Sequence, residues 1–344
     1  PIFAFARITE ITSGEVSKKI IMGFAIITIS IFSYFFIEKP FRNKKIKFNK
    51  ILSGIIFLIL IVVIFVSFII YNEGYKSRMP KNLQTVVNKE SHKLLENSNK
   101  QQCLQKKDGG KFNLSSNRKV FLVGDSHAAA LGFDLKDRII KKNFSFTTYL
   151  MGACGFFPGF NLVEKKSEKI DKDCNVEYFA SLRKKLLENS NSIIIFHASM
   201  PLYLDKNDDI SWKQKYKSNG KFESLSESFK NIINELSQNN KILLIYPVHE
   251  VGINVNRKLL NNHIKNLFKL ESLKADKIFS TPIEEYFNFS KSTFELFDSI
   301  KNKNIYRIYP HKVFCNTILK NSCACNDKEN IFYFDETHLS LAGS

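Results

Sequence analysis

A serine that could act as a nucleophile follows an apolar run in the middle third of the chain. Residues 120–131 read VFLVGDSHAAAL, in which four apolar residues lead into Gly-Asp-Ser-His and then into a run of small residues. A serine hydroxyl is a weak nucleophile until a neighbouring base removes its proton, and that base is most often histidine. Ser126 is therefore a candidate nucleophile at a strand-to-helix corner. The alternative is that it only caps the helix that follows.

A matching base and carboxylate stand near the C-terminus. Residues 333–344 read YFDETHLSLAGS, so Asp335 precedes His338 by three residues. Three residues make about one helical turn, so the carboxylate can reach the imidazole and hold it in the tautomer that a base requires. The two segments together predict a triad of Ser126, His338 and Asp335, which would act through a covalent acyl-serine.

Three further polar residues are candidates for lining the same site. His127 follows the serine directly, Ser199 lies in FHASMPLY at 196–203, and His249 lies in YPVHEVG at 246–252. Carboxylates and imidazoles in such a group could instead ligate a metal ion. The ligands of such a metal site would be Asp125, His127, Asp335 and His338. We rank this site below the triad and predict no metal there.

A parallel sheet with covering helices is the framework that would hold these residues. From residue 119 onward, short apolar runs rich in β-formers alternate with segments of helical periodicity, although the stretch 203–221 fits no element well. Strands that are apolar on both faces and alternate with helices are typical of a covered parallel sheet, whose ligands bind at the carboxyl ends of the strands. The predicted strands are 119–125, 144–150, 192–198 and 241–247, and the predicted helices are 127–142, 176–190, 222–239 and 255–275.

Two apolar runs before residue 72 predict membrane-spanning helices. Residues 20–37 and 51–71 are uncharged and about 18 and 21 residues long, close to the roughly 20 residues that a helix needs to cross a bilayer. The segment 38–50 between them carries six Lys and Arg residues and one Glu, and short loops rich in Lys and Arg stay in the cytoplasm. The residues that follow are therefore expected outside the cytoplasmic membrane, beginning with a polar linker over 72–118.

The cysteines indicate the same placement. All six follow the second apolar run, and an even number on the oxidising side of a membrane is typical of disulfides. A zinc site is the alternative, although the single residue between Cys323 and Cys325 is a tighter gap than zinc ligands usually show. The predicted pairs are Cys154–Cys174 and Cys315–Cys323, with Cys103 and Cys325 as a third pair.

The charge of the chain does not indicate a nucleic-acid partner. The 344 residues carry a net charge of +18, and 44% of them are hydrophobic, which is enough for a large core. The lysines are spread along the chain among Asn, Ile and Phe. Nucleic-acid binding would favour a compact basic patch with interleaved aromatic residues, so we predict no nucleic acid as a partner.

The two motifs resemble the first and last blocks of the SGNH/GDSL hydrolase-like family, namely Gly-Asp-Ser-His at 124–127 and Asp-Glu-Thr-His at 335–338. In addition, SYFFIEKPFRNK at 33–44 resembles the end of the acyltransferase family 3 membrane domain, where an Ile-Glu-x-Pro-x-Arg stretch follows the last helix. The SGNH resemblance covers 119–344, and the membrane-domain resemblance covers about 1–48. The resemblance implies an α/β SGNH-hydrolase-like domain of three layers with a parallel sheet, preceded by two transmembrane helices at about 20–37 and 51–71.

The resemblance also implies the roles of the site residues. Ser126 would be the nucleophile, His338 the base and Asp335 the residue that orients it. The oxyanion hole would use the backbone N–H of Ser126 and that of Gly152 in the loop MGACGFFPG, with Ala153 as the alternative to Gly152.

A third oxyanion donor of the family has no counterpart in this sequence. That donor is normally an asparagine in a Gly-x-Asn block, and the matching stretch here is FHASMPLY at 196–203. The donor is therefore absent, or His197 or Ser199 replaces it. Loss of one oxyanion donor costs roughly two to three orders of magnitude in rate.

Combined, the two resemblances point to the fused O-acetyltransferases that modify surface polysaccharides such as the lipopolysaccharide O-antigen. They imply a multi-pass protein of the bacterial inner membrane, with the SGNH domain in the periplasm and no cofactor bound to it. Acetyl-CoA would be the ultimate donor through a membrane domain that is expected mostly upstream of Pro1. The partners would be the bilayer, that membrane domain and a polysaccharide or lipopolysaccharide acceptor. The alternatives are a carbohydrate esterase with the same triad and a non-catalytic carbohydrate-binding domain.

Overall fold

The chain divides into two compact units, which we describe separately. The computed structural model describes residues 16–42, 48–75, 93–204, 213–267 and 278–344, together with Ala6 and Gln84. One unit comprises residues 1–84 and 257–277, and the other comprises residues 85–256 and 278–344. All of the candidate site residues belong to the second unit.

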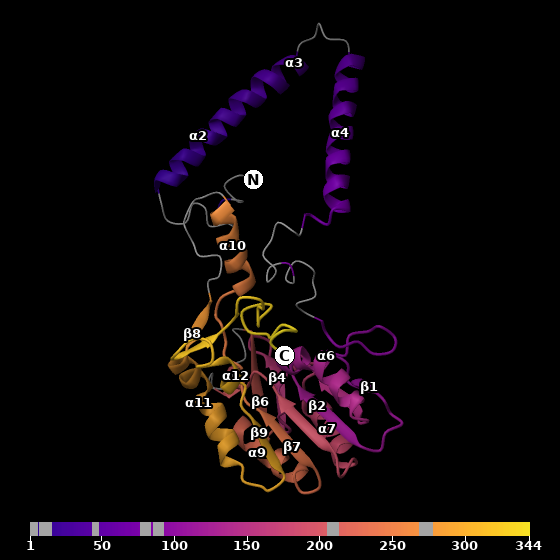
Figure 1. Cartoon of the computed structure of the whole chain (residues 1–344). Helices are drawn as coiled ribbons and strands as arrows, with labels where there is room; N and C mark the ends of the chain where they lie inside the picture. The colour runs from indigo at the N-terminus through magenta and orange to yellow at the C-terminus, as the bar shows by residue number, and fades with distance from the viewer. Residues whose placement is uncertain are drawn as a thin grey trace. The chain divides into compact units, whose positions relative to one another are not determined.

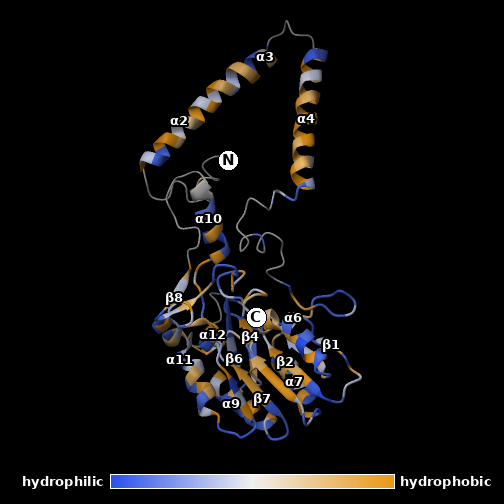
Figure 2. Cartoon of the chain, in the orientation of Figure 1, coloured by the Kyte–Doolittle hydropathy of each residue, from blue (hydrophilic) through white to orange (hydrophobic). Residues whose placement is uncertain are grey.

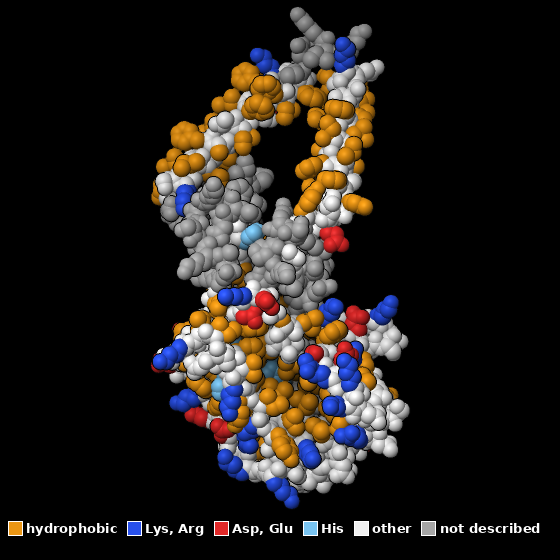
Figure 3. All heavy atoms as spheres, in the orientation of Figure 1, with side chains coloured by type: hydrophobic (Ala, Val, Ile, Leu, Met, Phe, Trp, Pro, Cys, Tyr) orange, Lys and Arg blue, Asp and Glu red, His pale blue; other side chains and the backbone are white. Residues whose placement is uncertain are grey.

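The first unit contains two long apolar helices. Helix α2 (Val16–Ser33) continues through a π-helical turn, η1 (Tyr34–Glu38), into the short α3 (Lys39–Phe41), and α4 spans Phe48–Tyr71. Hydrophobic residues dominate both long helices in Figure 2, and Figure 3 shows their side chains exposed. By length and composition, both helices can cross a membrane. Residues 43–47 of the predicted basic loop lie outside the described residues, as do 76–83 and 85–92 of the predicted linker.

A six-stranded sheet forms the centre of the second unit (Figure 1). Its strand order is β1-β3-β2-β5-β7-β9, and only β1 runs antiparallel to its neighbour. The four predicted strands are present as β2, β3, β5 and β7, so the predicted α/β fold class is confirmed. The strands span Gly110–Phe112 (β1), Lys119–Gly124 (β2), Ser145–Leu150 (β3), Ile193–His197 (β5), Lys241–Ile245 (β7) and Ile305–Ile308 (β9).

Helices cover both faces of this sheet. In β2, Val120 and Leu122 pack in one core cluster, which includes Ala128 of α6 (Ser126–Lys141). Phe121 and Val123 pack in the other cluster, with side chains from α7 (Val176–Leu187), α9 (Leu225–Leu236) and α11 (Ile283–Ser299). Successive side chains of a strand point to opposite faces. Because both faces of β2 are buried, its sequence is a continuous run of apolar residues rather than an alternation of apolar and polar ones.

Polar caps set where the helices begin. Asp125, Asn175 and Ser224 cap α6, α7 and α9, and each side chain accepts a backbone N–H from the first turn. The predicted helix over 222–239 is shorter in the structure: it begins after its cap at residue 224 and ends at Leu236. Helix α10 spans Val255–Leu267, and the rest of the predicted helix over 255–275 lies outside the described residues.

Several short strands and helices were not predicted from the sequence. Strands β4 (Phe160–Glu164) and β6 (Gln214–Ser218) pair antiparallel, as do β8 (Ser280–Pro282) and β10 (Ser322–Ala324). Strand β6 reads QKYKS, and only Tyr216 is buried in it, so it offers no apolar run to detect. Two short helices complete the unit, α8 (Met200–Leu204) and α12 (His311–Phe314).

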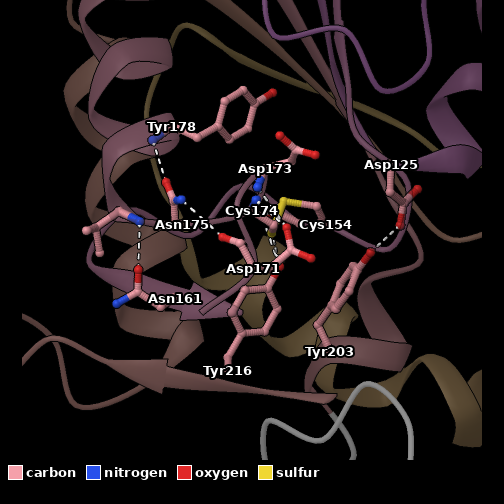
Figure 4. The surroundings of a disulfide bond; sticks show 12 residues. Asp125, Cys154, Asn161, Asp171, Asp173, Cys174, Asn175, Tyr178, Tyr203 and Tyr216 are labelled. Carbon is pink, nitrogen blue, oxygen red and sulfur yellow. Dashed lines mark hydrogen bonds between the residues drawn. A yellow bond between two sulfur atoms is a disulfide. The ribbon is translucent and has the colours of Figure 1, made fainter. Parts of the chain in front are cut away.

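Four of the six cysteines form disulfides. Cys154–Cys174 and Cys315–Cys323 are joined, as predicted, and Figure 4 shows the surroundings of the first bond. Cys103 and Cys325 are buried free thiols, so the predicted third pair is wrong. Cys103 packs in the core cluster beneath α6, whereas Cys325 contacts His249.

The Cys154–Cys174 bond should stabilise the second unit. It links the loop after β3 to the residues just before α7, across a separation of 20 residues. Replacing both cysteines with serine should lower the free energy of unfolding by about 3 kcal/mol, because the unfolded chain regains the entropy of an open loop. Urea denaturation of the detergent-solubilised chain, followed by circular dichroism, measures this difference. Peptide mapping that finds both residues as free thiols in the protein from the outer compartment would refute the pairing.

Candidate active site

Three neighbouring strands end at the same edge of the sheet, and each is followed by a candidate site residue. Gly124 at the end of β2 is the register partner of Leu150 in β3 and of His197 in β5. The residues two positions beyond these ends are Ser126, Gly152 and Ser199. Because all three strands run parallel, these residues emerge at the same edge, where parallel sheets place their sites.

Close packing of strands requires the glycine before the candidate nucleophile. A Cβ atom at Gly124 would lie 1.7 Å from the carbonyl oxygen of His197. No side chain fits at that distance without moving β2 away from β5. The glycine thus lets the strand that precedes Ser126 approach its neighbour closely.

Ser126, His338 and Asp335 form a hydrogen-bonded chain in the structure. Ser126 Oγ lies 2.8 Å from His338 Nε2, and His338 Nδ1 lies 2.8 Å from Asp335 Oδ2. Asp335 Oδ1 also accepts the backbone N–H groups of Thr337 and His338, at 2.8 and 2.7 Å. With Asp335 accepting the Nδ1 proton, Nε2 presents its lone pair to the serine hydroxyl. This is the arrangement in which histidine can take the proton of a nucleophilic serine.

The charges of the site favour a basic imidazole. Burial alone would raise the pKa of Asp335, but the hydrogen bonds from His338 and Thr337 outweigh it and lower that pKa to about 2. Burial alone would lower the pKa of His338, but the hydrogen bond and charge of Asp335 outweigh it and raise that pKa above its usual value of 6.5. Asp335 therefore stays ionised and stabilises the imidazolium that forms when His338 accepts a proton.

The Asp125 side chain stabilises the strand-to-helix corner at which Ser126 lies. The side chain is almost fully buried and accepts three hydrogen bonds: from the His127 N–H at 2.8 Å, the Ser199 N–H at 2.9 Å and the Tyr203 hydroxyl at 2.6 Å. Figure 4 shows the contact between Tyr203 and Asp125. One carboxylate thus joins the start of α6 to the end of β5 and to α8. Sequence reasoning missed Tyr203, which lies 78 residues from its partner.

His127 packs directly against the candidate base. The centroids of the His127 and His338 rings are 4.7 Å apart. Burial lowers the pKa of His127 to about 4, so this ring is neutral and adds no positive charge beside the imidazolium of His338. His127 therefore lies beside the predicted base, and its role in lining the site stays a prediction.

Two backbone N–H groups remain available for an oxyanion. Among the residues that the structure describes, neither the Ser126 N–H nor the Gly152 N–H donates a hydrogen bond. The loop that carries Gly152 is held to the end of β2, because the Met151 N–H donates to the Gly124 oxygen at 3.0 Å. These two N–H groups remain the predicted donors.

Ser199 and His197, the two residues considered as replacements for the missing asparagine, both make other hydrogen bonds. The backbone N–H of Ser199 donates to Asp125, and its hydroxyl donates to Glu250 at 3.5 Å. His197 donates its Nδ1–H to the Ile245 oxygen at 3.3 Å, since a carbonyl can only accept. Burial lowers the pKa of His197, so the ring is neutral and its Nε2 has no proton to donate.

His249 does not line this site. It is fully buried, and its ring contacts Tyr333 and Cys325. In the alternative metal site of Asp125, His127, Asp335 and His338, both carboxylates already accept hydrogen bonds. Within the described part of the chain, the ligand atoms that do converge belong to His249, Cys315 and Cys323.

A family match and a distant structural similarity relate the chain to known proteins. A family model described as an SGNH domain fused to AT3 domains matches residues 88–344. No curated protein matches the chain significantly. The solved structure of the periplasmic domain of a Salmonella ser. Paratyphi A lipopolysaccharide acetyltransferase is similar, with 18% sequence identity, a TM-score of 0.41, and coverage of 65% of this chain and 77% of that one. A similarity this distant does not assign an activity.

Proposed function

Because the chain belongs to the family of SGNH domains that are fused to AT3 domains, we propose that it is the outer part of a membrane-anchored O-acyltransferase. Its SGNH domain would move an acyl group, most simply acetyl, onto a sugar hydroxyl of a cell-surface polysaccharide or lipopolysaccharide. The observation that carries the proposal is the pair of 2.8 Å contacts that join Ser126 to His338 and His338 to Asp335.

The first half of the proposed reaction forms an acyl-serine. Ser126 Oγ attacks the carbonyl carbon of the acyl donor while its proton moves to His338 Nε2. The tetrahedral oxyanion accepts hydrogen bonds from the N–H groups of Ser126 and Gly152. When the intermediate collapses, the bond to the donor oxygen breaks, and the leaving oxygen takes the proton from His338.

The second half repeats the same steps with a different nucleophile. A sugar hydroxyl gives its proton to His338 and attacks the acyl-serine carbonyl. The Ser126 Oγ then leaves and recovers the proton. Only a well-placed acceptor can exclude water from this step, so the surroundings of the triad decide between transfer and hydrolysis.

We propose that the donor reaches Ser126 through the AT3 membrane domain, with acetyl-CoA in the cytoplasm as the ultimate source. The two apolar helices and the disulfides fit a membrane-anchored domain on the outer side. In this proposal the protein is a multi-pass protein of the bacterial inner membrane, and the SGNH domain faces the periplasm. The proposed domains are 1–48 and 51–71 in the membrane, a lead-in over 72–118 and the SGNH domain over 119–344. The end of the lead-in is part of the folded domain, because its strand β1 joins the central sheet.

An acceptor-competition experiment distinguishes the proposed transferase from an esterase. The purified chain in detergent receives an activated acetyl ester as donor, with and without lipopolysaccharide-derived oligosaccharides. We expect the oligosaccharide to become acetylated while release of free acetate falls. A parallel reaction with the Ser126→Ala variant measures the background.

Other outcomes would change the assignment. Acetate release that the oligosaccharide leaves unaltered would indicate an esterase. Failure of Ser126 to react with a serine-directed organophosphonate would indicate a non-catalytic domain.

A further inference from the structure

A second cluster of reactive side chains lies apart from the triad, around His249. We propose that in the reduced chain this cluster is a zinc-binding site. Its ligands are His249, Cys315, Cys323 and Cys325. This inference is independent of the acyl-transfer reaction.

Three of the four ligand atoms already converge, and the fourth lies against one of them. Those of His249, Cys315 and Cys323 all lie within 4.8 Å of one another, and Cys325 Sγ lies 3.7 Å from His249 Nε2. In a tetrahedral zinc site with ordinary Zn–S and Zn–N bond lengths, a sulfur and a nitrogen ligand are about 3.6 Å apart. All four side chains are buried, as is typical of structural zinc sites rather than catalytic ones.

Hydrogen bonds place the lone pair of His249 toward the sulfurs. The Tyr333 hydroxyl donates its only proton to the His249 carbonyl oxygen at 2.7 Å. At the 3.1 Å contact with His249 Nδ1, the Tyr333 oxygen must therefore accept, and Nδ1 must carry the proton. Nε2 is left with a lone pair that faces Cys325. Histidines that bind metals usually donate their other ring N–H to an oxygen in this way.

The local fold explains the tight spacing of two of the ligands. Cys323 lies in β10, and Cys325 follows that strand directly. Residues two apart in extended backbone point to the same face, so one intervening residue is the spacing that brings both sulfurs to one side. Cys315 pairs with Cys323 in a β-bridge, and His249 comes from the segment after β7. The one-residue gap, which argued against zinc on sequence alone, therefore fits a site built on a strand.

The zinc site and the Cys315–Cys323 disulfide are alternative states of the same side chains. The disulfide uses two of the sulfurs and leaves the Cys325 thiol against His249. In the reduced chain, Zn²⁺ would bind three thiolates and one neutral imidazole, and the three thiols would release three protons. The reduced state can arise in two ways. A dithiol can open an existing disulfide by supplying two electrons and two protons, or a newly made chain can bind the metal while all of its thiols are still reduced.

The cluster adjoins the segment that carries the proposed base. Tyr333 lies two residues before Asp335, and the Val251 N–H donates to the Glu336 oxygen at 3.0 Å. These contacts connect both sides of His249 to the segment 333–338. A bound ion that holds His249 would therefore also anchor this segment in the reduced chain.

Metal binding by the whole chain tests the proposal. The detergent-solubilised chain is reduced with a phosphine in the absence of oxygen, and either Zn²⁺ or Co²⁺ is added alone. We expect one equivalent of metal per chain to survive dialysis, and the Co²⁺ form to show the intense visible bands of tetrahedral thiolate coordination. Loss of a partner outside the first coordination sphere costs roughly 10- to 100-fold in metal affinity, so Tyr333→Phe should weaken binding by about 10-fold. Cys325→Ser removes a ligand and should weaken binding by more than about 100-fold. Cys103→Ser removes the other free thiol and should bind metal like the parent.

Alkylation of the parent chain gives a second readout that does not depend on how any variant folds. Zn²⁺ should protect Cys315, Cys323 and Cys325 from alkylation, while Cys103 reacts at the same rate with and without the metal. The proposal is overturned if the reduced chain retains no metal, if the three thiols are not protected, or if Cys325→Ser binds metal as tightly as Cys103→Ser.

Discussion

Replacing Ser126 with alanine should abolish acyl transfer, by a factor on the order of 10⁴ or more. The Ser126 Oγ is the atom that would carry the acyl group, and without it His338 has no nucleophile to activate. Transfer of radiolabelled acetyl to the oligosaccharide measures the effect. Formation of the acyl-enzyme should disappear with it. The fold should persist, because the Asp125 carboxylate, which holds the corner, is untouched by the change.

A matched serine provides the control for this variant. Ser181 lies on the exposed side of α7, so Ser181→Ala removes the same hydroxyl at a position without contact to the triad. It should transfer acetyl at the parental rate. A correctly folded Ser126→Ala chain that still acetylated its acceptor at near the parental rate would show that another residue is the nucleophile.

Replacing Asp335 with asparagine should lower the acylation rate by about 10⁴, as the equivalent change does in other serine triads. The variant amide cannot hold His338 in the tautomer that leaves Nε2 unprotonated.

The pH profile should change as well. In the parent, the rate should rise with pH through the pKa of His338, which Asp335 holds above 6.5, because only the unprotonated imidazole accepts the serine proton.

The direction of the pH shift separates this role from simple loss of structure. Removing the negative charge of Asp335 removes the stabilisation of the imidazolium, so the midpoint of the residual activity should move to lower pH. Glu336→Gln removes the neighbouring charge but leaves the Asp335 hydrogen bonds in place, and its midpoint should stay near that of the parent. An Asp335→Asn profile that kept the parental midpoint would argue against a direct charge interaction with His338.

The parts of this architecture that could be predicted from sequence are those that local patterns encode. The run before Ser126 is apolar at every position because β2 is buried on both faces, so strand and site could be recognised together. The spacing of Asp335 and His338 likewise depends on residues close in the chain. The two helices that can cross a membrane are recognisable because length and apolar composition alone define them.

Other features depend on contacts between distant segments, which local patterns do not record. Strand β9 alternates in burial and sits at the edge of the sheet, so it lacks the continuous apolar run that identified its neighbours. His249 follows β7 much as Ser199 follows β5, yet only the folded chain shows that Tyr333 and Cys325 enclose it. The roles of His197 and Ser199 were open for the same reason, since their partners Ile245 and Asp125 are 48 and 74 residues away.

The distance along the chain between the nucleophile and its base has a consequence for biosynthesis. Ser126 and His338 are separated by 212 residues. At typical rates of translation, about 10–40 s pass between the synthesis of the serine and that of the histidine. During that interval the emerging polypeptide holds the proposed nucleophile without its proposed base. In the proposed reaction, such a chain would not lose activated acyl groups to water before the fold is complete.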